Sequence, residues 1–264
     1  MLDLINIRKT FNPHTINEKV ALNGVNLHME SGDFVTVIGG NGAGKSTILN
    51  AIAGLWPLDE GRIVIDGQDV TGLCEYKRAA FIGRVFQDPM MGTAGNMQIE
   101  ENLAIAKRRG QKRGLSIGIT KEERQQYKEM LATLGLGLED RLTTKVKLLS
   151  GGQRQALTLL MATLTKPKLL LLDEHTAALD PRTAGKVLEL SNRIVKEHNL
   201  MTLMVTHNMK DAITYGNRLI MMHQGRIILD ISGEEKRSLT VPALMNEFAK
   251  ASGDELATDR ALLS

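Results

Sequence analysis

The sequence has few of the features that mark secreted, membrane-embedded or nucleic-acid-binding proteins. Cys74 is the only cysteine among 264 residues, which excludes an internal disulfide and fits a reducing cytoplasm. No apolar run approaches the roughly 20 residues of a membrane-spanning helix. The formal net charge is only +3, so the composition suggests no nucleic-acid partner. Residues 1–6 lack the basic flank and apolar core of a signal peptide, and we expect none.

A glycine-rich stretch follows an apolar run at residues 34–38. It reads Gly-Gly-Asn-Gly-Ala-Gly-Lys-Ser-Thr over residues 39–47, which matches the phosphate-binding loop G-x-x-x-x-G-K-[ST]. The run before it predicts a buried strand, and residues 46–53 predict a helix that Gly54 ends. Such a turn lets backbone N–H groups converge on phosphate oxygens, and the helix N-terminus adds a positive field.

The loop chemistry predicts a role for each of its polar groups. Lys45 would reach the β- and γ-phosphates, and the Ser46 hydroxyl would ligate Mg²⁺. The predicted nucleotide-binding residues of the loop are Gly39, Gly40, Asn41, Gly42, Ala43, Gly44, Lys45, Ser46 and Thr47. The pattern occurs in many NTPase families, so alone it indicates only that the chain binds a nucleotide.

A second apolar run, residues 169–172, ends in Asp173 and Glu174. Carboxylates at the C-terminal end of a buried strand suit an open α/β sheet, whose ligands lie beyond the strand ends. In phosphoryl transfer the protein mainly positions the reactants and stabilises the developing charge. We therefore predict that Asp173 holds Mg²⁺ and that Glu174 orients and deprotonates the attacking water.

The stretch Leu149-Ser150-Gly151-Gly152-Gln153 has no role in a general phosphate-loop fold. It resembles the signature motif of ATP-binding cassette (ABC) ATPases. Other motifs of that family then follow in order, and the resemblance runs from about residue 2 to residue 229. Gln87 resembles the Q-loop glutamine, residues 178–180 the D-loop, His207 the switch histidine, and Phe11 the aromatic residue that stacks on adenine, where tyrosine is commoner.

The signature also has a local meaning. Ser150 and Gln153 have the spacing of a capping box, which predicts a helix N-terminus at Ser150. Asp180 before Pro181 predicts another N-cap with proline at the first helical position. The resemblance implies that the ATP held by one chain's phosphate loop faces the signature of a second chain. It thereby adds Phe11, Ser150, Gly151, Gly152, Gln153 and Asp180 to the nucleotide-binding residues.

The resemblance also implies the catalytic and metal-binding sets. Glu174, His207, Gln87 and Lys45 are expected to act in hydrolysis. Mg²⁺ is expected to be bound by Ser46, Gln87 and Asp173. The family commonly has proline where this chain has His175, a departure that leaves both acidic residues in place.

These motifs predict an ATPase subunit that drives a transporter from the cytoplasmic face of a membrane. The expected partners are a second ATPase subunit, integral membrane permease subunits and a solute-binding protein. Residues 91–109 and 173–181 resemble ATPases of bacterial binding-protein-dependent uptake systems, some of them assigned to amino acids, including tryptophan-like ones. Three alternatives remain open: an ABC ATPase outside transport, a phosphate-loop kinase or GTPase, and a nucleotide-gated protein that does not hydrolyse ATP.

The order of the predicted elements indicates an α/β fold. Strands are expected at 4–8, 34–38, 63–65, 80–86, 169–173, 201–206 and near 218–229, with helices at 181–198 and 208–215. This predicts a mostly parallel sheet, a small antiparallel β subdomain and an inserted helical subdomain at 96–164, which includes a capping box at Thr120 and Glu123. We expect an ATPase domain over 1–233 and a short helical extension and tail over 234–264.

Two segments permit more than one interpretation. Residues 107–114 are basic and glycine-containing; they suit an exposed loop of the helical subdomain, or a contact with anionic lipid or the membrane partner. Met90 and Met91 follow the Q-loop; they suit an adaptable docking surface for the membrane subunit, or a buried pair.

Overall fold

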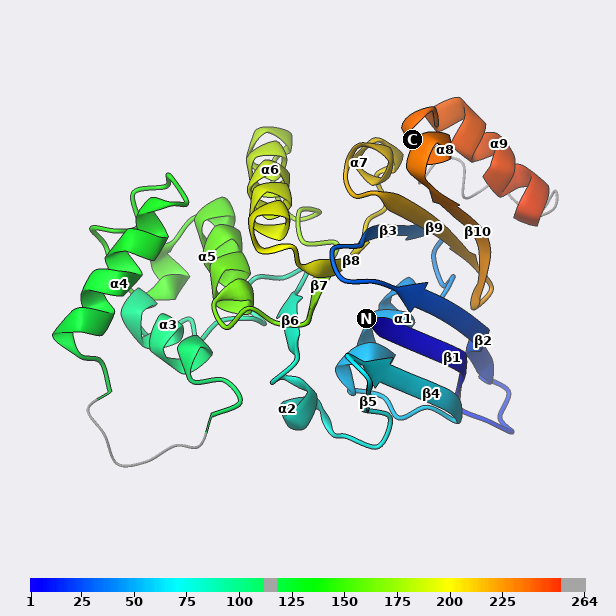
Figure 1. Ribbon diagram of the computed structural model, residues 1–264, viewed down its shortest axis with the longest axis horizontal. Helices are drawn as coiled ribbons and strands as arrows, with labels where there is room; N and C mark the ends of the chain where they lie inside the picture. Colours follow the sequence, from blue (N-terminus) through cyan, green and yellow to red (C-terminus); the bar gives the residue numbers. More distant parts are fainter. Residues whose placement is uncertain (112–117, 253–264) are drawn as a thin grey trace.

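The computed structural model describes residues 1–111 and 118–252, which form two sheets and the helices around them (Figure 1). The larger sheet has the order β10-β9-β3-β8-β7-β6. Its neighbours pair in parallel except β9 and β10, which are antiparallel. The strands are β3 (Phe34–Gly39), β6 (Ile82–Val85), β7 (Leu169–Asp173), β8 (Met201–Val205), β9 (Arg218–His223) and β10 (Arg226–Ser232). The mostly parallel sheet is confirmed.

The smaller sheet is antiparallel and has the order β2-β1-β4-β5. Its strands are β1 (Leu2–Phe11), β2 (Lys19–Met29), β4 (Glu60–Ile65) and β5 (Gln68–Asp69). The sequence did not predict β2, because Asn23, Gly24 and Asn26 interrupt its apolar alternation. Pairing with β1 along its whole length, from Phe11 opposite Lys19 to Leu2 opposite Met29, holds β2 in place despite these residues.

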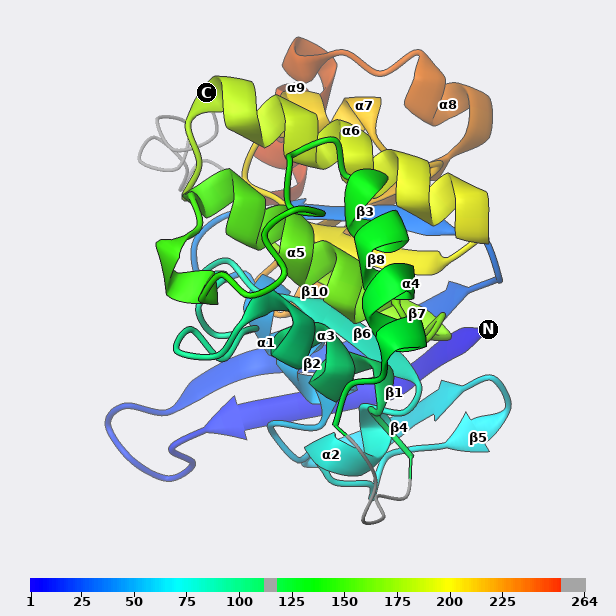
Figure 2. The ribbon, with the colours of Figure 1, turned by 90° about the vertical axis from the view of Figure 1, so that its left-hand side faces the viewer.

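The helices are α1 (Lys45–Ala53), α2 (Glu75–Arg78), α3 (Ile99–Lys107), α4 (Lys121–Ala132), α5 (Gly151–Thr163), α6 (Pro181–His198), α7 (Met209–Thr214), α8 (Gly233–Arg237) and α9 (Val241–Ser252). Figures 1 and 2 place α3, α4 and α5 at one end of the molecule, away from the antiparallel sheet. The capping boxes at Thr120 and Ser150 are confirmed, as is the Asp180 cap with Pro181. No described helix is long and apolar enough to cross a membrane.

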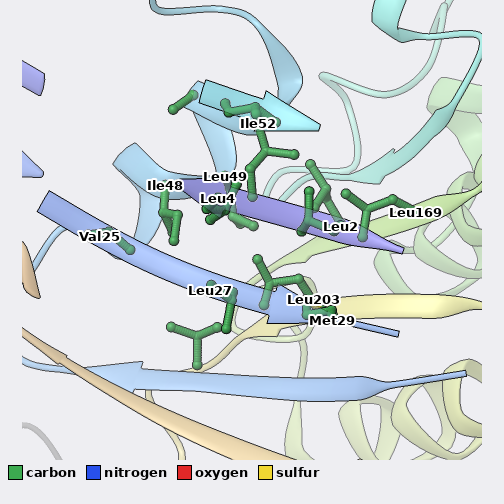
Figure 3. Packing of buried hydrophobic residues seen from close by; sticks show 14 of the residues in the cluster. Leu2, Leu4, Val25, Leu27, Met29, Ile48, Leu49, Ile52, Leu169 and Leu203 are labelled. Carbon is green, nitrogen blue, oxygen red and sulfur yellow. The ribbon is translucent and has the colours of Figure 1, made fainter. Parts of the chain in front are cut away.

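One apolar core joins the antiparallel sheet to the parallel one through α1 (Figure 3). Leu4 from β1 lies beside Ile48 and Leu49 from α1, and Leu2 lies nearer Leu169 from β7; all five are fully or almost fully buried. Burial of this kind stabilises a fold by roughly 25 cal/mol for each Å² of apolar surface. The helix of the phosphate loop is therefore fixed between the two sheets.

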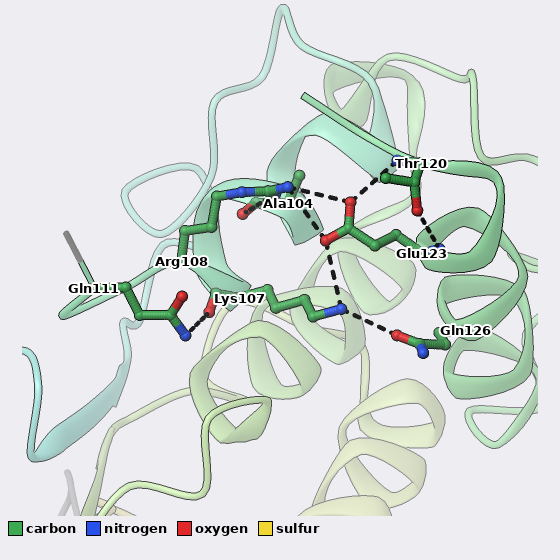
Figure 4. A network of polar contacts seen from close by, with 7 residues as sticks. All are labelled: Ala104, Lys107, Arg108, Gln111, Thr120, Glu123 and Gln126. Atoms are coloured by element: carbon green, nitrogen blue, oxygen red, sulfur yellow. Dashed lines mark hydrogen bonds and ion pairs between the residues drawn. The ribbon is translucent and has the colours of Figure 1, made fainter. Parts of the chain in front are cut away.

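The described part of the basic stretch contacts the helical region itself (Figure 4). Arg108 and Lys107 both form ion pairs with Glu123, which also closes the capping box of α4. Arg109 donates hydrogen bonds to the Ala162 carbonyl and the Thr165 hydroxyl. Lys107 and Arg108 thus connect the end of α3 to α4, and Arg109 connects the same segment to the end of α5. Contact of the stretch with anionic lipid or the membrane partner stays a prediction. The remaining cations of the stretch, Lys112 and Arg113, lie outside the described residues.

Candidate functional site

The glycine-rich loop lies between the end of β3 and the start of α1, as the local pattern predicts. Gly39 and Gly44 have positive φ angles of 152° and 105°. A Cβ on Gly39 would lie 2.2 Å from the Met222 carbonyl oxygen, and one on Gly44 would lie 2.6 Å from the Ala21 carbonyl oxygen. The loop therefore passes so close to β9 and β2 that only glycine fits at these two positions.

Lys45 opens α1, and its side chain folds back over the loop. Its ammonium donates to the carbonyl oxygens of Gly39 at 2.8 Å and Gly40 at 3.0 Å. Ala43 is buried beneath it, and its carbonyl accepts a hydrogen bond from Gly225 N–H. Among the described residues no side chain caps α1 at Gly44, so first-turn N–H groups are left without a capping partner and could donate to phosphate oxygens.

A cavity of about 220 Å³ lies against this loop. It is lined by Phe11, Lys19, Ala21, Asn41, Gly42, Gly44, Lys45, Ser46, Thr47 and Glu174. The fold thus brings Phe11, from the antiparallel sheet, and Glu174, from the end of β7, to the phosphate loop. Sequence reasoning missed Lys19 and Ala21, because both belong to the unpredicted strand β2.

Asp173 ends β7 and contacts an arginine from the neighbouring strand. Its Oδ2 atom lies 3.4 Å from Arg84 Nη2, which also donates to Asn50 Oδ1 at 2.7 Å. Burial raises the pKa of Asp173, and the Arg84 guanidinium opposes that rise. Neither Arg84 nor Asn50 was among the predicted site residues. The sequence shows only that Arg84 is the one charge in an otherwise apolar strand; its place beside Asp173 follows from the pairing of β6 with β7.

Glu174 and His207 face each other beyond the ends of β7 and β8. His207 Nδ1 lies 3.7 Å from Glu174 Oε2. Glu174 has a left-handed φ of 43°, which is uncommon for a residue other than glycine, and its N–H donates to the Val205 carbonyl. Backbone strain of this kind concentrates at functional positions. The side chain of His207 is 53% exposed and that of Glu174 is 22% exposed, so both are accessible.

The signature lies at the start of α5, on a second cavity of about 660 Å³. Ser150, Gly152 and Gln153 line this cavity, and no residue of the phosphate loop does. The D-loop packs behind it: Asp180 Oδ1 accepts from Thr183 N–H, and a Cβ on Gly152 would lie 2.2 Å from Thr183 Cγ2. Gly151 lies against Leu179 in the same contact.

Gln87 is exposed just beyond β6, beside a groove of about 980 Å³. Phe86 and Met91 line the groove, and Gln155 Nε2 donates to the Phe86 carbonyl beneath it. Met90 is 40% exposed and Met91 is 71% exposed. The interpretation of these methionines as a buried pair is therefore wrong.

The residues near the phosphate loop fit a magnesium–nucleotide complex better than a protein-only metal site. In the described parts of the chain, no three His, Cys, Asp or Glu residues are placed to hold a metal ion by themselves. Mg²⁺ commonly takes one or two protein oxygens and completes its shell with phosphates and water. Ser46 offers such an oxygen in the cavity at the start of α1. Asp173, whose carboxylate interacts electrostatically with Lys45, offers another.

Residues 22–177 match the family model described as "ABC transporter". The chain is 45% identical to a tyrosine transport ATP-binding protein of Clostridioides difficile (strain R20291), over 95% of this chain and 100% of that protein. It is 33% identical to the spermidine/putrescine import ATP-binding protein PotA of Haemophilus influenzae, over 89% of this chain but 59% of that protein.

Solved structures are similar over most of their length. One is the dimeric structure of a post-hydrolysis state of an ATP-binding cassette bound to ADP and Pi, with a TM-score of 0.75 and 30% identity over 88% of this chain and 98% of that one. Another is a nucleotide-free ATP-binding cassette from an ABC transporter, with a TM-score of 0.73 and 28% identity over 89% and 92% of the two chains. These similarities agree with the two-sheet fold described above.

Proposed function

The chain belongs to the ABC transporter family of ATP-binding ATPases, and on that premise we propose that two copies hydrolyse ATP at a shared interface to drive solute import. The observation that carries the proposal is the placement of the two motifs. Within the described parts of the chain, the cavity at the phosphate loop and the cavity at the signature have no lining residue in common. A second copy in head-to-tail orientation would supply Ser150 and Gly152 to the nucleotide held by the first.

The contacts around Glu174 support its assignment to the hydrolytic step. Its carboxylate lines the phosphate-loop cavity and faces His207, so it is placed to orient and deprotonate a water molecule. We assign His207, Lys45 and Gln87 to contacts with the transferred phosphate. Ser46, Gln87 and Asp173 would hold Mg²⁺, which supplies neutralisation of the phosphate charge.

The groove near Gln87 supports docking of an integral membrane permease subunit. It is lined by Phe86 and Met91, with Tyr76 and Ile105 also exposed on it at 73% and 46%. Exposed apolar side chains gathered on one hollow surface mark an interaction site. Through this contact the ATPase would sit peripherally on the cytoplasmic face of the membrane.

The cargo is proposed from the names of the relatives. A tyrosine transport protein and a methionine import protein are both similar to this chain, at 45% and 36% identity. We assign amino acids as the solute class, delivered by a solute-binding protein.

We also assign residues 1–233 to the ATPase domain, 96–164 to its helical subdomain, and 234–264 to a short C-terminal extension.

Trapping the dimer tests the shared-interface mechanism. The Glu174→Gln variant retains every phosphate contact but lacks the base, so Mg²⁺ and ATP should convert it to a stable dimer on size-exclusion chromatography, with phosphate release abolished. Adding Ser150→Glu, which places a negative charge at the signature, should restore the monomer. Normal phosphate release by Glu174→Gln would remove Glu174 from the role of base.

An affinity pull-down from detergent-solubilised native membranes tests the role in transport. We expect a multi-span membrane protein in stoichiometric amount, together with a solute-binding protein. The Met91→Asp variant should lose the membrane protein while its ATP binding stays normal. Recovery with ribosomes or DNA instead would assign the ATPase to work outside transport, and binding of ATP without phosphate release would indicate a nucleotide-gated interaction protein.

A further inference from the structure

Lys19 begins β2 and reaches over the phosphate loop. It lies opposite Phe11 in the ladder between β1 and β2, so the antiparallel sheet fixes where its side chain starts. Its Nζ atom is 3.1 Å from the position that a Cβ on Gly42 would occupy, and its Cε atom is 3.8 Å away. The side chain lines the same cavity as Lys45 and Ser46.

Among the residues that the structure describes, this ammonium group has no hydrogen-bond or ion-pair partner. Across residues 1–111 and 118–252, no hydrogen bond or ion pair involves the side chain of Lys19. Lys9, on the adjacent strand, instead pairs with Asp59 at 2.9 Å. Glu174 lines the same cavity but pairs with His207 rather than with Lys19. The charge of Lys19 therefore faces the loop, and no side chain in the described parts of the protein neutralises it.

We propose that Lys19 binds the phosphate chain of the nucleotide as a second cation opposite Lys45. The inference rests on the proposed ATP site and adds a residue that lies outside the phosphate-loop motif. An ammonium that reaches the open side of the loop would donate charge-assisted hydrogen bonds to phosphate oxygens. The β1–β2 pair would then contact the nucleotide at two points. Phe11 would stack on the adenine, and Lys19 would bind the phosphates.

The expected effect is moderate, because Lys19 is exposed and water competes for the contact. Neutralising it in Lys19→Gln, which keeps most of the side-chain stem, should raise the Kd for Mg²⁺–ATP about tenfold at low salt. The increase should shrink at about 0.5 M salt, since screening weakens an exposed electrostatic contact. Lys19→Arg should bind ATP almost as tightly as the wild type.

The experiment is a calorimetric titration of the full chain with Mg²⁺–ATP at two salt concentrations. Lys121→Gln is the matched control, because Lys121 is an exposed lysine at the start of α4, remote from the loop. An ATP Kd for Lys19→Gln equal to that of the wild type would overturn the inference while leaving the ATP site intact. A wild-type protein that binds no ATP would overturn the proposed function itself. Equal thermal unfolding of all variants would show that each is folded.

Discussion

Arg84 Nη2 lies 3.4 Å from Asp173 Oδ2 and thereby links the proposed metal-binding carboxylate to the strand that leads into the Q-loop. The same nitrogen bonds to Asn50 in α1, and the guanidinium stacks over the Phe86 ring at 4.5 Å. Among the described residues, Nε and Nη1 of Arg84 are buried without a hydrogen-bond partner. One arginine therefore contacts the phosphate-loop helix, the acidic strand and the groove side of the sheet.

Removing Arg84 should destabilise the protein, because it leaves the partly buried Asp173 carboxylate without its counter-ion. In Arg84→Met the carboxylate, 16% exposed, loses its counter-ion, and we expect the free energy of unfolding to fall by about 1–3 kcal/mol. In the Asp173→Asn background the same change should cost much less. Urea unfolding of the four proteins in this double-mutant cycle measures the coupling. Strictly additive losses would mean that the two side chains do not interact.

His175 should make the stability of the protein sensitive to acid. Its Nε2 atom lies 3.0 Å from Ser191 Oγ, and complete burial lowers the pKa of His175 from 6.5 to about 4. Below pH 6.5 the unfolded chain takes up a proton that the folded chain does not. Stability should therefore fall by about 3 kcal/mol between pH 6.5 and pH 4 through this residue alone.

The variant His175→Met isolates that contribution, because Ser191 keeps its hydrogen bond to the Val187 carbonyl. Unfolding free energies of the two proteins should be measured from pH 7.5 to pH 4. We expect the wild-type curve to drop more steeply than the variant curve over the acid half of this range. Parallel curves would show that His175 does not remain neutral when folded.

Gly152 has no room for a side chain because Thr183 packs against it. Gly152→Ala would bring a methyl group to 2.2 Å from Thr183 Cγ2, and we expect a loss of about 1–3 kcal/mol together with weaker ATP hydrolysis. ATP binding should persist, since the phosphate-loop cavity is separate. Adding Thr183→Ser removes the clashing methyl and should recover stability.

The control for this substitution is Gly185→Ala in α6, where an added Cβ would meet nothing within 4 Å. That change should leave hydrolysis intact and stabilise the helix by about 1 kcal/mol. Thermal unfolding measures the effect of each substitution on stability, and phosphate release from the same samples measures its effect on ATP hydrolysis. If Thr183→Ser does not improve Gly152→Ala, contact with Thr183 is not the reason for the glycine.

Trp56 should report nucleotide binding, because it is the only tryptophan and its ring centroid lies 4.8 Å from that of Phe11 in an edge-on contact. Adenine stacking on Phe11 would change the surroundings of the indole. We expect a saturable change in tryptophan emission on titration with ATP, retained in Phe11→Tyr and lost in Phe11→Ala. Binding seen by calorimetry without any change in emission would place adenine away from Phe11.

Local patterns determined much of this protein. The capping boxes at Ser150 and Thr120, the cap at Asp180 and the limits of β7 were all predicted, because each depends on residues within one turn or one strand. The family was likewise readable, since its motifs are short and occur in a fixed order. The roles of the site residues remain predictions that the variants above will test.

The tertiary structure alone decided which distant residues meet. Strand β2 exists because β1 pairs with it, and only that pairing brings Lys19 to the phosphate loop. Arg84 looked like one charge in an apolar strand until β6 was placed beside β7. Contacts of this kind depend on pairing between segments far apart in the chain. A local sequence pattern does not show which distant segments pair.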